Sequence, residues 1–136
     1  MRFTGQLVKS GKWYAAEVPM LGIDTQGRTK AEAYAMVKDA IESLVDRKGF
    51  EATVYPGKGN YFEVGANDHA IWVAFLLRRQ RFVHGMSLAD VTKRLGLKSR
   101  NAYARYEQGR SVPSADKMLE LLQALGTDVV MTSPAA

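Results

Sequence analysis

Hydrophobic and polar residues alternate along the first part of the chain with the period of two that is typical of β-strands. Phe3, Gly5 and Leu7 fall on one side of the segment 2–9. A second segment, 13–18, follows a short turn that contains glycine and ends before a proline. The pattern predicts a β-hairpin, and the glycine-containing stretch after it predicts a loop up to residue 28.

The period then changes to that of a helix. Thr29 and Glu32 have the spacing of a capping box, so a helix is predicted to begin there, and Gly49 is placed to end it in a left-handed cap. Apolar residues at helical spacing form one stripe that is expected to pack on the hairpin: Ala33, Met36, Val37, Ala40, Ile41, Leu44 and Val45.

Two more segments, 50–55 and 61–64, have the composition of strands and predict a second hairpin or a strand with a long loop. Residues 65–70 have no periodicity and predict a linker or the cap of the next helix, with Asp68 as the capping residue. The sequence therefore predicts an α+β protein with a small ββαβ-type domain over residues 1–67 and a second domain over residues 68–136.

The second domain is predicted to be all-α. Its four predicted helices cover about 71–84, 88–95, 100–108 and 114–125, each followed by a glycine, and a short extra strand is expected at 129–131. The third helix is expected to bury Ala102, Tyr103 and Tyr106, and the fourth to present one apolar face formed by Met118, Leu119, Leu121, Leu122 and Leu125. The first helix combines its main apolar face, which includes Phe82, with a second face containing Trp72, Val73 and Leu77. That second face packs on the N-terminal domain or forms a dimer interface, and the pattern favours neither.

Composition excludes several classes of function. The 136 residues contain no cysteine, so a disulfide framework, a thiolate nucleophile and a cysteine-rich zinc site are excluded. No apolar run approaches the about 20 residues of a membrane-spanning helix, and the N-terminus lacks the apolar region of a signal peptide. We therefore expect a cytoplasmic protein without a membrane partner. Neither His69 nor His84 has a sequence context that marks a catalytic base.

The positive charge is concentrated in the second half of the chain. The net charge is +5, and residues 78–110 alone contain nine Lys or Arg against two acids. Fixed positive charge attracts nucleic acid, but only charges that cluster in space make a binding surface. The spacing of these residues therefore matters more than their number.

A run of residues in the first domain carries a family resemblance. The motif consists of W-Y-A-A-E-V-P at 13–19, L-G at 21–22, T-Q-G-R-T at 25–29 and E-A at 32–33. It resembles the signature of HicB-type antitoxins. The resemblance implies a partial ribonuclease-H-like fold that binds and blocks a HicA-type ribonuclease toxin. The toxin-contacting residues are expected in the loop from Leu21 to Thr29 and on the exposed side of the sheet, with Leu21, Asp24, Gln26 and Arg28 as candidates.

Catalysis by this domain is not expected. A ribonuclease-H-type site needs several carboxylates that converge on divalent metal ions. Glu17 and Glu63 lie in predicted strands without a third supporting ligand, and the acids of the predicted helix lie largely off its apolar stripe. We therefore expect neither an enzyme nor a metal or other cofactor, although a metal-dependent nuclease is the enzyme-class alternative.

A helix, a tight turn containing glycine and a second short helix form the layout of a helix-turn-helix. L-A-D-V-T-K-R-L-G at 88–96, Y-E-Q-G-R at 106–110 and V-P-S at 112–114 resemble the Xre/Cro-like repressor family over residues 71–126. The resemblance implies a DNA-binding domain whose third helix enters the major groove. It also implies a structural ion pair between Arg81 and Glu107, joining the first and third helices.

The outward face of that third helix is expected to read DNA. Arg100 suits a bidentate contact with guanine, Asn101 suits adenine, and Arg105 suits a base or a phosphate. Lys98, Ser99 and Arg110 are expected to hold phosphates. Because one helix-turn-helix reads only a few base pairs, a homodimer or tetramer is expected.

Together, the two resemblances predict an antitoxin that neutralises a HicA-type toxin and represses its own operon by binding operator DNA. The alternative is a stand-alone transcription regulator whose first domain dimerises or senses a ligand.

Overall fold

The computed structural model describes residues 1–133 and divides them into two compact units, Met1–His69 and Ala70–Ser133. Residues 134–136, the end of the predicted second domain, lie outside the described residues. No helix within residues 1–133 has the length and apolar character needed to cross a membrane.

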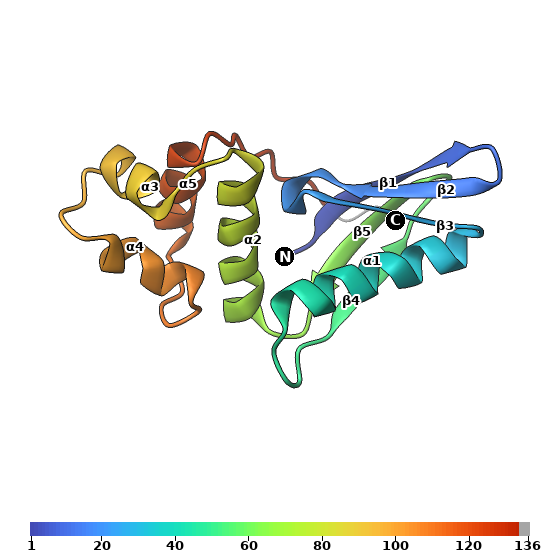
Figure 1. Ribbon diagram of the computed structural model, residues 1–136, viewed down its shortest axis with the longest axis horizontal. Helices are drawn as coiled ribbons and strands as arrows, with labels where there is room; N and C mark the ends of the chain where they lie inside the picture. The colour runs from blue at the N-terminus through green and yellow to red at the C-terminus, as the bar shows by residue number, and fades with distance from the viewer. Residues whose placement is uncertain (134–136) are drawn as a thin grey trace. The chain divides into compact units, whose positions relative to one another are not determined.

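The first unit is an antiparallel sheet of five strands with one long helix packed against it (Figure 1). Its elements are β1 (Phe3–Ser10), β2 (Trp13–Val18), a 3-10 turn η1 (Pro19–Leu21), β3 (Ile23–Gly27), α1 (Lys30–Val45), β4 (Ala52–Pro56) and β5 (Tyr61–Ala66). The strand order is β3-β2-β1-β5-β4, and α1 packs against β2, β3 and β4. Strands β3 and β4 therefore form the two edges of the sheet.

The period-two pattern of the sequence sets the core of this unit. Phe3 and Leu7 of β1 are buried, whereas Thr4 and Gln6 between them are exposed. On α1 the buried residues recur every four positions and are Ala33, Val37, Ile41 and Val45. The apolar stripe is narrower than predicted, because Met36 and Leu44 are 41% and 47% exposed, about 100° around the helix from their buried neighbours.

Three expectations for the first unit were wrong. The segment predicted as a loop before α1 contains β3, so the order of strands and helix along the chain is βββαββ and not ββαβ. Helix α1 ends at Asp46, which takes the left-handed conformation (φ 49°), and not at Gly49. Aspartate tolerates this conformation because its short polar side chain bonds locally. Residues 65 and 66, predicted as linker, complete β5.

The second unit consists of four helices, α2 (His69–Val83), α3 (Leu88–Arg94), α4 (Arg100–Glu107) and α5 (Ala115–Ala124). Val91 of α3, Tyr103 of α4 and Leu121 of α5 are fully buried. Ser114 begins α5 by accepting a hydrogen bond from the amide of Lys117, so the predicted start of the fourth helix is confirmed. Four helices at the predicted places agree with the all-α expectation for this part of the chain.

Exposure corrects the predicted apolar faces of the second unit. Phe82 and Leu119 are 67% and 52% exposed, although both were assigned to core-facing stripes. Leu119 lies near one edge of its helix's apolar stripe, where a small rotation decides between burial and exposure, whereas Phe82 lies in the last turn of α2, two turns beyond the buried Phe75 on the same side. The strand expected at 129–131 is also absent, because no described residue of this unit forms a strand with which it could pair.

Gly5 offers a test of the packing in the first unit. It lies opposite Phe62 in the sheet, and a Cβ at this position would lie 2.3 Å from the Phe62 ring, which is fully buried. We expect Gly5→Ala to lower the free energy of unfolding by about 1–3 kcal/mol, because the ring has no space into which to move. Urea unfolding would measure this, with the exposed Thr4→Ala as control. Equal stability of the two variants would contradict the packing described here.

Candidate functional site

Helix α3 begins with a complete capping box. The hydroxyl oxygen of Ser87 accepts a hydrogen bond from the amide of Asp90 (3.0 Å), and the Asp90 carboxylate accepts one from the amide of Ser87 (2.8 Å). These bonds lower the pKa of Asp90, so its carboxylate stays ionised and the cap is complete at neutral pH. The start of the helix-turn-helix is thereby fixed by local sequence.

The turn between α3 and α4 is also fixed locally. Gly96 has a φ of 68°, and its amide donates to the carbonyl of Lys93 (3.1 Å), while the amide of Leu97 donates to the carbonyl of Thr92 (3.0 Å). A left-handed residue at this point is the usual end of a helix and favours glycine. Ser99 then caps α4 by accepting a hydrogen bond from the amide of Asn101 (3.2 Å).

Helix α4 has one buried and one exposed side. Tyr103 and Glu107, four residues apart, face inwards. Asn101 and Arg105 lie about 200° around the helix from Tyr103 and are exposed, as is Arg100. Ala102 is exposed as well, so the expectation that it faces inwards was wrong, because it lies about 100° from the direction that Tyr103 sets. The exposed surface of α4 thus carries two guanidinium groups, one amide and one methyl group, with Arg100 in the first turn about 100–140° around the helix from Asn101 and Arg105.

An ion pair holds α4 against α2. The Arg81 Nε lies 2.9 Å from Oε2 of Glu107, and its Nη2 lies 3.0 Å from Oε1, so the pairing is bidentate. Arg81 Nη1 also donates to the carbonyl of Met86 (3.2 Å) in the turn before α3. The hydrogen bonds to Glu107 raise the pKa of Arg81 above its ordinary value. The residues that the repressor resemblance pairs are therefore in contact.

Tyr103 fills the space behind α4. Its side chain is fully buried, and its hydroxyl has no hydrogen-bond partner within residues 1–133. Burial, followed by the nearby Glu107 carboxylate, raises the pKa of Tyr103 far above the usual tyrosine value. The ring therefore stays neutral and serves as an apolar support under the exposed face of the helix.

The remaining candidate residues surround α4 at the surface. Lys98, Ser99 and Arg110 are exposed, so they are accessible to phosphates on either side of the helix. None of Lys98, Arg100, Arg105 and Arg110 forms an ion pair within the described part of the chain. Arg94 differs, because its guanidinium donates to the carbonyl of Ala124 at the end of α5 (3.1 Å). The basic charge that is free for an anionic partner is therefore centred on α4.

The candidate toxin-binding residues of the first unit divide into two groups. Leu21 is fully buried, so its assignment as a contact residue was wrong, because its side chain belongs to the core. Asp24, Gln26 and Arg28 are exposed. Asp24 and Gln26 line an open groove of about 600 Å³ at the β3 edge, and the Arg28 guanidinium lies 5.3 Å from the centre of the Trp13 ring.

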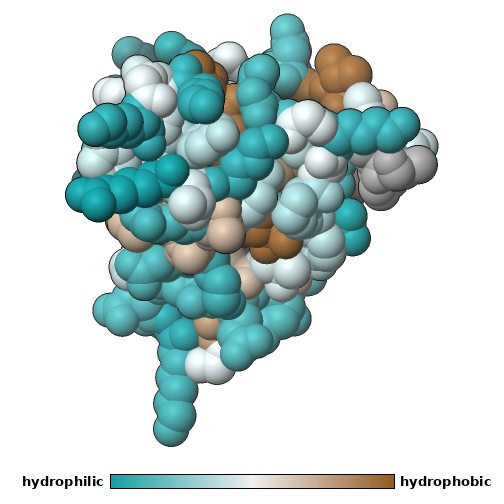
Figure 2. All heavy atoms as spheres, turned by 90° about the vertical axis from the view of Figure 1, so that its right-hand side faces the viewer, coloured by the Kyte–Doolittle hydropathy of each residue, from teal (hydrophilic) through white to brown (hydrophobic). Residues whose placement is uncertain are grey.

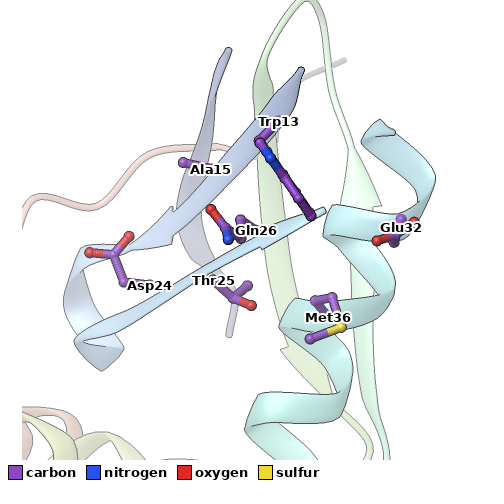
Figure 3. A pocket seen from close by; sticks show the side chains of 7 residues that line it. All are labelled: Trp13, Ala15, Asp24, Thr25, Gln26, Glu32 and Met36. Carbon is purple, nitrogen blue, oxygen red and sulfur yellow. The ribbon is translucent and has the colours of Figure 1, made fainter. Parts of the chain in front are cut away.

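Other residues of this groove were missed. They are Trp13, Ala15, Glu32 and Met36, whereas Thr25, which also lines the groove, lies in the predicted contact segment from Leu21 to Thr29 (Figure 3). Trp13 was detectable in principle, because it shares the outward phase of β2 with Ala15 and Glu17, opposite to the buried Ala16 and Val18. A single exposed apolar side chain is ordinary, but Trp13 lines the same groove as the exposed Met36, so the two form a shared apolar surface.

The carboxylates considered for metal-dependent catalysis were Glu17 and Glu63. Glu63 is buried, and its carboxylate contacts Arg2 (3.2 Å) and the hydroxyl of Tyr61 (2.7 Å), which are protein partners. Residues 1–133 contain no group of three or more His, Asp or Glu side chains arranged to hold a metal ion. The geometry therefore gives Glu63 a place in a hydrogen-bonded network within the protein.

Comparison with known families supports the assignment of the second unit. Residues 72–134 match a family described as a helix-turn-helix domain. The match covers α3, α4 and α5 with the turns that connect them, as well as most of α2. It supports a DNA-binding helix-turn-helix in this part of the chain. Comparison with curated proteins gave no match.

The Arg81–Glu107 pair can be tested by removing the carboxylate. Glu107→Ala leaves a partly buried guanidinium without its partner, so we expect the free energy of unfolding to fall by about 3 kcal/mol. Glu120→Ala breaks the exposed pair with Lys117 (3.4 Å) and should cost less than about 1 kcal/mol. Chemical denaturation of both variants measures the difference. Equal losses would show that the buried pair does not hold α4.

Proposed function

We propose that this protein is a sequence-specific DNA-binding repressor that acts on its own operon through α4. The observation that carries the proposal is the exposed surface of α4, where Asn101 and Arg105 lie on the side opposite Tyr103 and Arg100 is exposed in the first turn, with Lys98 before it. Donors of this kind on a short, rigidly held helix suit the edges of bases in the major groove. The helix-turn-helix match over residues 72–134 supports the same proposal independently.

Each exposed residue has a role in this proposal. Arg100 binds guanine through two hydrogen bonds, Asn101 binds adenine in the same way, and Arg105 contacts a base or a phosphate. The methyl group of Ala102, which the exposure of this residue adds to the face, suits the methyl group of thymine. Lys98, Ser99 and Arg110 hold the flanking phosphates and set the register without reading sequence.

We further propose that the first unit is the toxin-binding part of a HicB-type antitoxin with a partial ribonuclease-H-like fold. The resemblance of residues 13–33 to that family supports this proposal, as does the exposure of Asp24, Gln26 and Arg28 at the β3 edge. In this proposal the unit blocks a HicA-type ribonuclease and has no catalytic role or cofactor of its own. The protein then acts in the cytoplasm as a homodimer or tetramer, because an operator offers two half-sites.

The DNA-binding proposal predicts different losses for Arg100→Ala and Lys98→Ala. Duplexes would first be selected from a random-sequence pool on the full chain, and gel-shift titrations at one salt concentration would then compare selected with random DNA. Arg100→Ala should weaken binding of the selected duplex by about 1–3 kcal/mol and relax the preference at one position. Lys98→Ala should weaken both duplexes about equally.

Lys117→Ala serves as the control, because it removes one positive charge from α5 and not from the candidate interface. It should leave the preference for selected DNA unchanged. The proposal is contradicted if no sequence is enriched by the selection, or if Arg100→Ala and Lys98→Ala cause the same loss on both duplexes.

The antitoxin proposal predicts rescue of growth. A HicA-type toxin encoded next to this gene would be expressed with and without the full chain, followed by co-purification of the two proteins. Growth arrest that this chain relieves, with a stable complex, is the expected result. If the neighbouring product is not toxic and forms no complex, the alternative remains, in which the first unit of a stand-alone regulator dimerises or senses a ligand.

A further inference from the structure

The two edges of the sheet in the first unit differ in whether the outward backbone groups of the edge strand have hydrogen-bond partners. At the β4 edge, the amide of Ala52 donates to the Glu42 carboxylate (2.9 Å) and its carbonyl accepts from Lys38 Nζ (2.8 Å). The same strand ends with Pro56, which has no amide hydrogen. Side chains and a proline thus occupy hydrogen-bonding positions at this edge, which is a usual protection against pairing with another chain.

The β3 edge has no such protection. The two-residue turn between β1 and β2 makes Ser10 and Trp13 a hydrogen-bonded pair, and the bonding direction then alternates along each strand. It follows that Ile23, Thr25 and Gly27 bond to β2, whereas the backbone groups of Asp24 and Gln26 point away from the sheet. No bond to the backbone of either residue is present within residues 1–133.

An apolar surface lies directly beside this free edge. Trp13 is 38% exposed and Met36 is 41% exposed, and both line the groove of about 600 Å³. Figure 3 shows the Trp13 ring reaching over β3 towards the start of α1, with Gln26 and Asp24 on one side and Met36 beyond it. Elsewhere the face seen in Figure 2 is largely hydrophilic, with hydrophobic residues in separate small patches.

Three carboxylates lie at the groove or beside it, while the Arg28 guanidinium lies 5.3 Å from the centre of the Trp13 ring. Glu17 and Asp24 are direct cross-strand partners on the exposed face of the sheet, and Glu32 lines the groove from the first turn of α1. None of these three carboxylates forms an ion pair in the described part of the chain. Like charges directly opposite each other are destabilising, so a cation between Glu17 and Asp24 is favoured.

We infer that the β3 edge docks an extended segment of a basic partner protein, which adds to the sheet as a further strand and places a Lys or Arg side chain in the groove. The backbone of Asp24 and Gln26 supplies the pairing groups, as in other cases of strand addition. The aliphatic part of the basic side chain lies on Trp13 and Met36, and its charge meets Asp24 and Glu32. A ribonuclease toxin that binds RNA has the required charge, so this inference deepens the toxin-binding part of the proposed function.

The probe for the test is a fluorescein-labelled seven-residue peptide with alternating threonine and arginine, compared with the same peptide carrying glutamate in place of arginine. Fluorescence anisotropy would be measured with the full chain. The arginine peptide should bind at least about tenfold more tightly than the glutamate peptide, because only the former complements the groove. Acrylamide quenching of Trp13 should fall on binding, since the other tryptophan, Trp72, is buried in the free protein.

Two variants separate the charge from the strand edge. Asp24→Lys should weaken the arginine peptide by about tenfold or more, because it reverses the charge in the groove. Gln26→Pro removes an amide that points away from the sheet, so the fold should survive while strand addition is lost, which circular dichroism would check. Asp39→Lys makes the same charge change on an exposed part of α1 that does not line the groove, and it should leave binding unchanged.

The inference is overturned if neither peptide binds, if both bind equally, or if Asp39→Lys weakens binding as much as Asp24→Lys does. These results are distinct from failure of the antitoxin proposal. Peptide binding without any toxin rescue would keep the docking edge and remove the toxin. Toxin rescue that Asp24→Lys and Gln26→Pro leave intact, without peptide binding, would keep the antitoxin and place its contact elsewhere.

Discussion

The candidate DNA-binding surface depends on the guanidinium group of Arg81. This one group, carried by α2, contacts α4 through Glu107 and the turn before α3 through the carbonyl of Met86, so it joins these three parts of the second unit. A short helix such as α4 has little stability of its own, because its formation depends on packing more than on propensity. Tyr103 supports the helix from below, while the ion pair fixes its rotation about its own axis. The exposed residues are therefore held before any DNA arrives, and little side-chain freedom is lost from the supporting layer on binding.

In the first unit, by contrast, the outer edge of β3 has polar groups without partners among residues 1–133. The β4 edge is closed by side-chain hydrogen bonds and a proline, whereas the outward backbone groups of β3 are free in the described part of the chain. In addition, an acidic residue of β3 lies directly beside an acidic residue of β2 on the same face of the sheet. Features of this kind reduce the stability of an isolated domain, and an edge that is left open favours pairing with another chain. Because the β4 edge of the same sheet is protected, the open β3 edge indicates a pairing site and not merely an exposed strand.

The elements with strong local signals were predicted well from sequence, and those that depend on tertiary context were not. The starts of α3, α4 and α5 were predicted at the right places because the caps at Ser87, Ser99 and Ser114 are short-range hydrogen bonds that the sequence itself specifies. Strand β3 was missed because its polar residues and flanking glycines have the composition of a loop, and only pairing with β2 makes it a strand. The outward orientation of Ala102 could not be read from spacing alone, because the rotation of α4 is set by contacts with a distant helix. The groove around Trp13 is formed by β2, β3 and α1, which follow one another along the chain, but it could not be predicted while β3 was taken for a loop.

The length of α4 limits how much information one copy of the protein can extract from DNA. Eight helical residues extend over about 12 Å, which corresponds to about four base pairs along a duplex. A sequence of four base pairs recurs by chance about once in every 256 positions, so a genome contains many thousands of equivalent places. Reading a second such sequence at a fixed distance multiplies these odds and makes a match rarer by another factor of about 256. The choice of one operator therefore depends on the number of base pairs read as well as on the strength of each contact. Two recognition helices in a fixed spatial relation double that number.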